Sequence, residues 1–203
     1  MMPEALKELI NSIGYLPGIG EKSATKLAFF LLNSNKNYVE KLSNNMLNIK
    51  NKVHFCNICH SLTDINRDIC NICSSESRNK SMIAVVEEYL DMLTLEESGG
   101  YNGTYHILGG VISPINGVFI GDLNFEQLFR KISDFDGKLE LILATNPNIE
   151  GEATSSYITE EIEKRGLKYK VKITRLSRGL SSGYIEYADN ITIVNALKER
   201  KEI

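Results

Sequence analysis

The chain has 203 residues, of which 42% are hydrophobic and 24% are charged, and its formal net charge is −3. This balance is ordinary for a globular protein of one or two domains and excludes an intrinsically disordered chain. The longest unbroken apolar run, Leu27 to Leu32, has six residues, far fewer than the ~20 that a membrane-spanning helix needs. No secretory signal stands at the N-terminus, so we expect a cytoplasmic protein without membrane contact.

The charge is unevenly distributed along the chain. Residues 1–55 contain seven lysines and four glutamates, for a net charge of +3, whereas residues 81–203 carry 13 basic and 19 acidic groups, for a net charge of −6. A basic N-terminal module on an acidic body favours a nucleic-acid partner more than the total charge does. A chance cluster of surface lysines is the alternative that charge alone leaves open.

Hydrophobic spacing predicts four segments. Residues 1–52 repeat apolar side chains at helical spacing. Residues 53–77 are polar and cannot bury a core, so they need another source of order. Residues 78–175 alternate strand-like and helical patterns, which predicts a parallel sheet covered by helices. Residues 176–203 form a short tail with a strand-like stretch and a charged end. Within the third segment we expect strands at 81–86, 105–108, 139–144 and 169–174, and helices near 90–98, 123–132 and 153–165.

The sequence Leu16-Pro17-Gly18-Ile19-Gly20 separates two helical patterns. Gly18 and Gly20 permit backbone angles and close approaches that a β-carbon would block. The first amides of the following helix have no partner within that helix, so they form an anion site that suits a DNA phosphate. Lys22 and Lys26 lie on the same face of that helix. This pattern is typical of a helix-hairpin-helix that binds DNA through phosphates, and an ordinary helical hairpin is the alternative.

Four cysteines follow the pattern Cys-x2-Cys-x10-Cys-x2-Cys. Each Cys-x2-Cys pair can chelate one metal ion, and the two pairs complete a tetrahedron that leaves no open position for water or substrate. We therefore expect a structural zinc finger, with Zn²⁺ favoured by the soft ligands. Two disulfides or an iron–sulfur cluster are the alternatives. We expect His54 and His60, which flank the first pair, to lie at the surface. The predicted ligands are Cys56, Cys59, Cys70 and Cys73.

Acidic side chains follow two expected strands. Glu87 ends the first, and the loop that contains Glu150 and Glu152 ends another. The carboxyl ends of parallel strands meet at one edge of a sheet, so these three glutamates are predicted to converge. The pattern resembles the Toprim domain of topoisomerases, primases and some nucleases. Catalytic members hold Mg²⁺ with two aspartates of this loop, where this chain has Asn146 and Asn148.

Because asparagine offers a neutral oxygen to a hard cation, the loss of both aspartates predicts weak Mg²⁺ binding at best and makes two-metal chemistry doubtful. A weak Mg²⁺ site, an acidic patch for a partner and a solvated loop all remain open for the three glutamates.

The order of the modules is more specific than any one motif. A helix-hairpin-helix, a four-cysteine site, a Toprim domain and a short tail resemble the RecR family of bacterial recombination mediators over essentially the whole chain. In the tail, residues 183–189 resemble the family's Walker-B-like segment, which we expect to pack against a neighbouring subunit. Other stretches that carry the resemblance are Val85-Val86-Glu87, Tyr105-His106-Ile107-Leu108-Gly109-Gly110, Ala144-Thr145-Asn146-Pro147 and Glu150-Gly151-Glu152-Ala153-Thr154.

The resemblance implies an α/β protein of several modules. These are a helix-hairpin-helix DNA-binding module (1–52), a four-cysteine zinc finger (53–77), a Toprim domain (78–175) and a C-terminal oligomerisation tail (176–203).

The resemblance also implies a non-enzymatic clamp that forms a ring of two or four subunits around DNA. With RecO, and in many bacteria RecF, such a clamp loads RecA onto gapped or single-stranded DNA. The DNA, single- or double-stranded, would be bound without sequence specificity. Two alternatives remain at this stage: a metal-dependent Toprim nuclease or relaxase, and a zinc-stabilised adaptor that never touches DNA.

Overall fold

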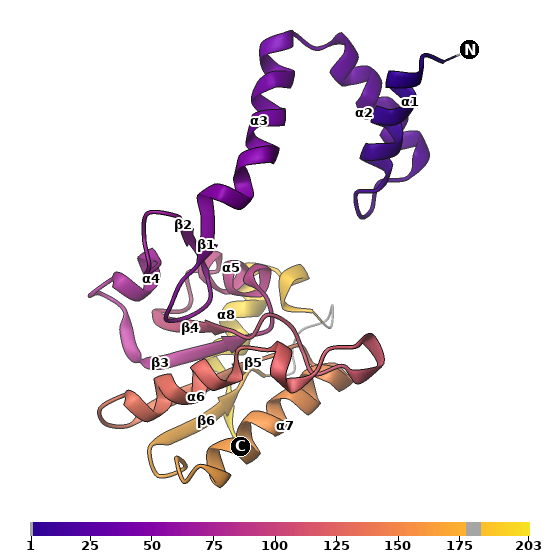
Figure 1. Ribbon diagram of the computed structural model, residues 1–203. Helices are drawn as coiled ribbons and strands as arrows, with labels where there is room; N and C mark the ends of the chain where they lie inside the picture. The colour runs from indigo at the N-terminus through magenta and orange to yellow at the C-terminus, as the bar shows by residue number, and fades with distance from the viewer. Residues whose placement is uncertain (1, 178–183) are drawn as a thin grey trace. The chain divides into compact units, whose positions relative to one another are not determined.

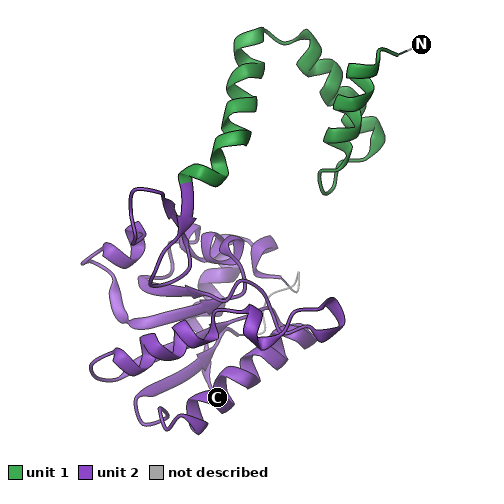
Figure 2. Cartoon of the chain, in the orientation of Figure 1, with its two compact units in different colours: residues 1–52 green, residues 53–203 purple. Residues whose placement is uncertain are grey.

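The computed structural model describes residues 2–177 and 184–203 (Figure 1). The chain divides into two compact units, residues 1–52 and residues 53–203 (Figure 2). Gly183, at the start of the Walker-B-like stretch, lies outside the described residues.

The first unit is built from helices, as the spacing of its apolar residues predicts. Helices α1 and α2 pack through small residues, because Ala24 and Ala28 are fully buried and a β-carbon on Gly14 would lie 3.8 Å from that of Ala24. Helix α3 buries none of its residues. The three helices are α1 (Glu4–Gly14), α2 (Glu21–Asn33) and α3 (Lys36–Lys52).

The second unit is built on a five-stranded sheet with the order β4-β3-β5-β6-β7. The first four strands in this order are parallel, and β7 runs antiparallel to β6. The second half of β3 and most of β5 are apolar and buried, as expected for inner strands of a parallel sheet with both faces covered. The bounds are β3 (Asn79–Val86), β4 (Gly103–Ile107), β5 (Leu139–Ala144), β6 (Val171–Arg175) and β7 (Lys201–Glu202).

Helices cover both faces of this sheet (Figure 1). Helices α6 (Phe125–Asp134) and α7 (Ile149–Lys164) enclose one apolar cluster with the sheet. Helices α5 (Tyr89–Glu97) and α8 (Asn190–Lys198) enclose the other. The predicted parallel sheet covered by helices is confirmed. The described residues of the unit also contain the one-turn 3-10 helices η1 (Pro114–Asn116), η2 (Ile120–Asp122) and η3 (Ile185–Tyr187).

The cysteine segment precedes the sheet in the chain. It consists of an antiparallel pair, β1 (Val53–Phe55) and β2 (Leu62–Asp64), followed by the single turn α4 (Asn71–Ser74). The buried hydrophobic residues at its centre are the four cysteines, with Ile72 packed against them. The segment therefore has no apolar core of ordinary size, as its polar composition predicts.

The strand-like stretch expected in the tail, before residue 190, is not a strand in the described residues. Residues 185–187 form η3, helix α8 follows, and strand β7 comes only at the C-terminal end. Asp189 begins α8 because it accepts a hydrogen bond from the backbone N–H of Thr192 (3.0 Å). The buried residues of α8 recur at helical spacing: Ile193, Ala196 and Leu197. None of the helices in residues 2–177 and 184–203 has the length and apolar character of a membrane span.

Candidate functional site

The glycine hairpin is a tight turn between α1 and α2. Ile19 N–H donates to the carbonyl of Leu16 (3.1 Å), and Ala24 N–H donates to the carbonyl of Gly20 (2.9 Å). Gly18 has φ of +77°, a left-handed conformation that strains any residue with a β-carbon. Gly20 has an ordinary φ of −81°, and no atom lies within 4 Å of the place where its β-carbon would be. The fold of the unit therefore explains glycine at position 18 and not at position 20.

The N-terminus of α2 is open to solvent. No side chain caps it, so the first amides of the helix keep free N–H donors. Lys22 and Lys26 are exposed one turn apart, and neither has an ion-pair partner among the described residues. Two ammonium groups next to a positive helix end form a surface that attracts anions.

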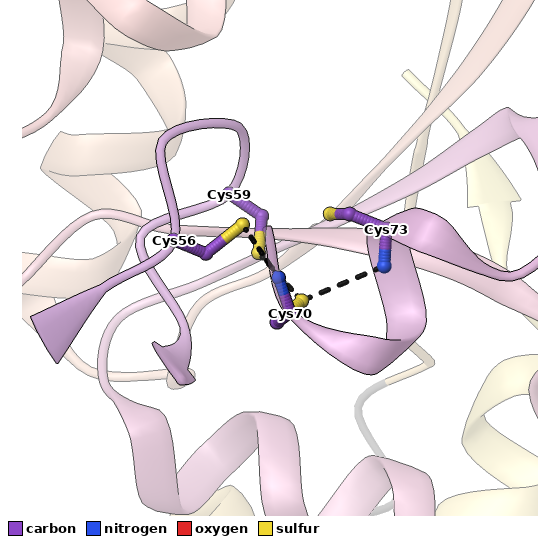
Figure 3. A group of neighbouring side chains, drawn as sticks. All are labelled: Cys56, Cys59, Cys70 and Cys73. Atoms are coloured by element: carbon purple, nitrogen blue, oxygen red, sulfur yellow. Dashed lines mark hydrogen bonds between the residues drawn. The ribbon is translucent and has the colours of Figure 1, made fainter. Parts of the chain in front are cut away.

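The four cysteines lie close together in the second unit (Figure 3). Their Sγ atoms are all within 4.8 Å of one another, and the Sγ atoms of Cys59 and Cys70 are 3.6 Å apart. Backbone N–H groups donate to three of the sulfurs. Ser61 N–H lies 3.5 Å from Cys59 Sγ, Cys70 N–H lies 3.3 Å from Cys56 Sγ, and Cys73 N–H lies 3.5 Å from Cys70 Sγ. The backbone is thus arranged to stabilise negative sulfur.

The thiols compete for protons in the absence of a cation. The hydrogen bond between Cys59 and Cys70 raises the pKa of Cys59 and lowers the pKa of Cys70. One divalent cation would replace these protons and let all four sulfurs act as thiolate ligands. In the described part of the chain, this is the one group of three or more His, Cys, Asp or Glu side chains close enough to share a metal ion. The donor set and its spacing fit a closed tetrahedral site.

The histidines beside the first cysteine pair are partly buried, in contrast to the surface positions expected. His54 Nε2 lies 2.7 Å from the carbonyl of Arg67. The ring centroid of His60 lies 5.9 Å from that of His106, which is fully buried on β4. Burial lowers the pKa of His106 to about 3, so this ring is neutral at physiological pH.

The second feature of this unit is a pair of residues at the carboxyl ends of β3 and β5. Glu87, buried to 7% exposure, accepts a hydrogen bond at each carboxylate oxygen from Asn146. The backbone N–H lies 2.6 Å from Oε1, and the side-chain Nδ2 lies 2.5 Å from Oε2. Burial raises the pKa of Glu87, and these two donors act in the opposite direction. Asn146 thus supplies two hydrogen-bond donors to the carboxylate of Glu87.

Asn146 also binds the tail. Its Oδ1 accepts a hydrogen bond from the backbone N–H of Ile185 (2.8 Å), so one side chain joins β3, β5 and η3. The next helix comes so close that a β-carbon on Gly151 would lie 2.1 Å from the carbonyl oxygen of Asn146 and 2.9 Å from Glu87 Oε1. Glycine is therefore required between Glu150 and Glu152.

The three predicted glutamates have different surroundings. Glu87 is held by Asn146, and Glu150 lies near enough for its charge to raise the pKa of Glu87 further. Glu152 forms an ion pair with Arg175 at the end of β6. Asn148 caps α7, because its Oδ1 accepts from Gly151 N–H (2.7 Å). The glutamates thus share one edge of the sheet but do not form a single cluster.

A small acidic pocket of about 150 Å³ opens beside Glu87. Asp91 is the most buried acid that lines it, with 4% exposure against 7% for Glu87. Burial raises the pKa of Asp91 to about 7, and the charges of Glu87, Glu186 and Glu88 raise it further. The sequence pattern did not identify Asp91, since it looks like an ordinary acid in the first turn of a helix. The lining residues are Glu87, Glu88, Asp91, Asn146, Tyr184 and Glu186.

Comparison with known proteins agrees with this architecture. A family profile described as "RecR, helix-hairpin-helix" matches residues 6–50, and one described as "Toprim domain" matches residues 81–177. A protein named "Recombination protein RecR" from Chloroherpeton thalassium is 42% identical over 203 residues, which are 98% of this chain and 97% of the relative. A protein of the same name from Streptococcus uberis is 42% identical over 204 residues and covers both chains fully. The shared name is that of a recombination protein and not of an enzyme.

The burial of Asp91 generates a prediction about pH. Because its pKa is raised to about 7 in the folded protein, the ionised carboxylate destabilises the fold above pH 7, and protonation removes this penalty as the pH falls toward 4. Asn at this position keeps an acceptor for Glu88 N–H, which now donates to Asp91 Oδ2 (2.9 Å). We expect Asp91→Asn to raise the free energy of unfolding by about 2–3 kcal/mol more at pH 8 than at pH 5, as measured by urea denaturation.

The matched control is Asp122→Asn, because exposed Asp122 accepts the same type of hydrogen bond, from Phe119 N–H (2.9 Å). We expect its effect to be the same at both pH values. An Asp91→Asn effect equally independent of pH would contradict the account of the acidic pocket.

The pairing of Asn146 with Glu87 generates a second prediction. Asn146→Asp places two carboxylates face to face in a buried site, so we expect a loss of about 2–4 kcal/mol in the free energy of unfolding at pH 8. The loss should be smaller at pH 5, where a proton is shared, and millimolar Mg²⁺ should recover part of it at pH 8. Asn148→Asp makes the same chemical change at the N-cap of α7, where a carboxylate can accept the same hydrogen bond and is favoured by the helix dipole. We expect it to change the free energy of unfolding little. An Asn146→Asp variant as stable as the wild type at pH 8 without Mg²⁺ would disprove the pairing.

Proposed function

The chain belongs to the RecR family of recombination proteins, and on that premise we propose that it is a DNA-binding recombination mediator rather than an enzyme. In this proposal it forms a ring-shaped clamp that acts with RecO, and with RecF where present, to load RecA at gapped or single-stranded DNA in the cytoplasm. The observation that carries the proposal is the uncapped N-terminus of α2, beside which two lysines have no ion-pair partner in the described part of the chain.

The DNA contact is assigned to the hairpin of the first unit. Lys22 and Lys26 would each neutralise a phosphate, and the free amides of α2 would bind a phosphate oxygen. The open space beside Gly20, which the fold of the unit does not use, supports a close approach by the sugar–phosphate backbone. Gly18 supplies the left-handed backbone conformation of the turn that precedes α2. Contacts of this kind carry no sequence information, so binding would be non-specific.

Exposed apolar faces support assembly with further copies of the chain. Helix α3 presents Leu42, Met46 and Ile49 at helical spacing, yet buries none of its residues within its own chain. The tail exposes apolar side chains as well, since Tyr187 and Ile191 are each more than 70% exposed. Apolar patches of this kind mark protein interfaces. We assign the α3 face and the tail to two separate contacts, since two contacts per chain are what a ring of two or four subunits needs.

A ring would also explain how a weak phosphate site can be useful. Each hairpin offers few contacts, but several hairpins in one closed assembly raise the effective concentration of every site around the DNA.

The acidic pocket is assigned to a basic protein partner, with RecO as the candidate. Glu87, Glu88 and Glu186 line it together with Asp91, and no lysine or arginine is among the described residues that line it. Electrostatic attraction to a basic surface would speed association. A weak Mg²⁺ site at Glu87, Glu150 and Glu152 stays a prediction. A metal-dependent nuclease or relaxase is disfavoured because Asn146 stands where such an enzyme would need a metal-binding carboxylate.

The metal assigned to the cysteines is a structural Zn²⁺. Cys56, Cys59, Cys70 and Cys73 would hold it, and it would order residues 53–77, which have almost no core of their own. With that segment as a separate module, residues 78–175 and 176–203 would be the Toprim domain and the tail.

Changing the two lysines tests the proposed DNA contact. We expect Lys22→Gln with Lys26→Gln to weaken binding of labelled single- and double-stranded DNA at least about tenfold at low salt. The slope of log K against log salt should become shallower by about 2 for each hairpin that contacts the DNA, because two phosphate contacts are lost. Fluorescence anisotropy over a salt series measures both quantities.

The matched control is Lys36→Gln with Lys41→Gln, which removes the same charge from α3. It should change the affinity and the salt slope much less. If both pairs reduced binding equally, the contact would not be at the hairpin, and if the wild type bound no DNA, the adaptor hypothesis would replace the clamp.

A further inference from the structure

Strand β4 forms one edge of the sheet, and its outer backbone groups need partners. On one side β4 pairs with β3, and Leu108 N–H donates to the carbonyl of Val86 (3.0 Å) in that direction. Because backbone groups alternate along a strand, Tyr105 and Ile107 present their N–H and C=O groups to the outer side. An open edge of this kind invites pairing with another chain unless something covers it.

Two groups from different parts of the fold cover this edge at the same point. Ile107 N–H donates to the carbonyl of Cys59 (2.9 Å), one of the four clustered cysteines. Lys131 Nζ, from helix α6, donates to the carbonyl of Tyr105 (3.0 Å). The Tyr105 carbonyl and the Ile107 N–H are neighbours on one edge of one strand. The ammonium group of Lys131 therefore lies next to the cysteine knuckle.

The charge of Lys131 has no carboxylate partner. It forms no ion pair with Asp or Glu in the part of the chain that the structure describes. Burial lowers the pKa of Lys131, and the negative charges of the four cysteines act in the opposite direction. Lys131 is half-buried, and withdrawing a cation from water without a counter-ion is costly. Four thiolates around one Zn²⁺ carry a net charge of −2. The attraction between this charge and the ammonium group of Lys131 reduces the free-energy cost of withdrawing each of them from water.

We propose that Lys131 is the counter-charge of the metal centre, a positioning residue of α6 that strengthens metal binding and fastens the cysteine segment to the edge of the sheet. The proposal rests on the zinc assignment made above. It follows that the metal site and the Toprim sheet are energetically coupled. Loss of the metal would leave the charge of Lys131 without a counter-charge and would weaken the contacts that cover the outer edge of β4. Outer partners of a metal site typically change its affinity by roughly 10–100-fold.

Zinc release to a competing chelator, followed with a metal-sensitive dye, tests the role of Lys131. We expect Lys131→Met to lose zinc at a chelator concentration roughly 10–100-fold lower than the wild type does. Lys131→Gln keeps an N–H donor but no charge and should behave like Lys131→Met, whereas Lys131→Arg keeps the charge and should recover most of the affinity. Arg130→Met removes an exposed charge from the same helix and should release zinc as the wild type does.

The outcomes separate the two proposals. A wild-type protein that binds no zinc would disprove the zinc assignment and this inference together. Zinc-binding wild type with unchanged affinity in Lys131→Met and Lys131→Gln would overturn only the counter-charge. Wild-type affinity in Lys131→Gln alone would also overturn it, because the hydrogen bond and not the charge would then be responsible. A lower melting temperature with unchanged zinc affinity would reveal a purely structural role. Should Lys131→Met fail to fold, the comparison of Lys131→Gln with Lys131→Arg gives the answer.

Discussion

The two hydrogen bonds from Asn146 to the carboxylate of Glu87 hold together the carboxyl edge of the Toprim sheet. They stabilise a buried acid that would otherwise need a proton or a cation. The side chain of the same asparagine accepts a hydrogen bond from the backbone N–H of Ile185, so it also fixes the start of η3 in the tail against this edge of the sheet. Gly151 allows α7 to begin against this pair without a steric clash. A site that could hold ions in a catalytic relative is filled here by groups of the chain itself.

This arrangement explains why a Toprim fold can serve a recombination protein. With Glu87 occupied and Glu152 paired to Arg175, little of the edge is available for metal-dependent cleavage. The remaining acids line a pocket at the surface of an acidic unit. The exposed lysines of the hairpin belong to the other, basic unit. Binding of DNA and binding of a basic protein are therefore assigned to different parts of one chain, which is what a mediator between the two needs.

Much of this could be predicted from the sequence, because the relevant signals are local. Apolar runs located β3 and β5, and the Cys-x2-Cys spacing predicted that the four cysteines would lie together, because each pair spans only a few residues. The donor role of Asn146 could not be predicted, since Glu87 is 59 positions away and their contact depends on the register in which Val86 lies beside Ala144. Lys131 looks like a surface lysine of α6 until the edge of β4 is seen beside it. In the tail, the helical spacing of α8 is masked by the apolar stretch before it.

The central claim is that the edge around Glu87 binds chain and partner rather than catalytic ions. The most direct test is incubation of the purified protein with supercoiled plasmid in the presence of Mg²⁺ or Mn²⁺, read by agarose gel electrophoresis. The account predicts that the plasmid remains supercoiled at every metal concentration. Metal-dependent nicking or relaxation that disappears in Glu87→Gln would contradict it.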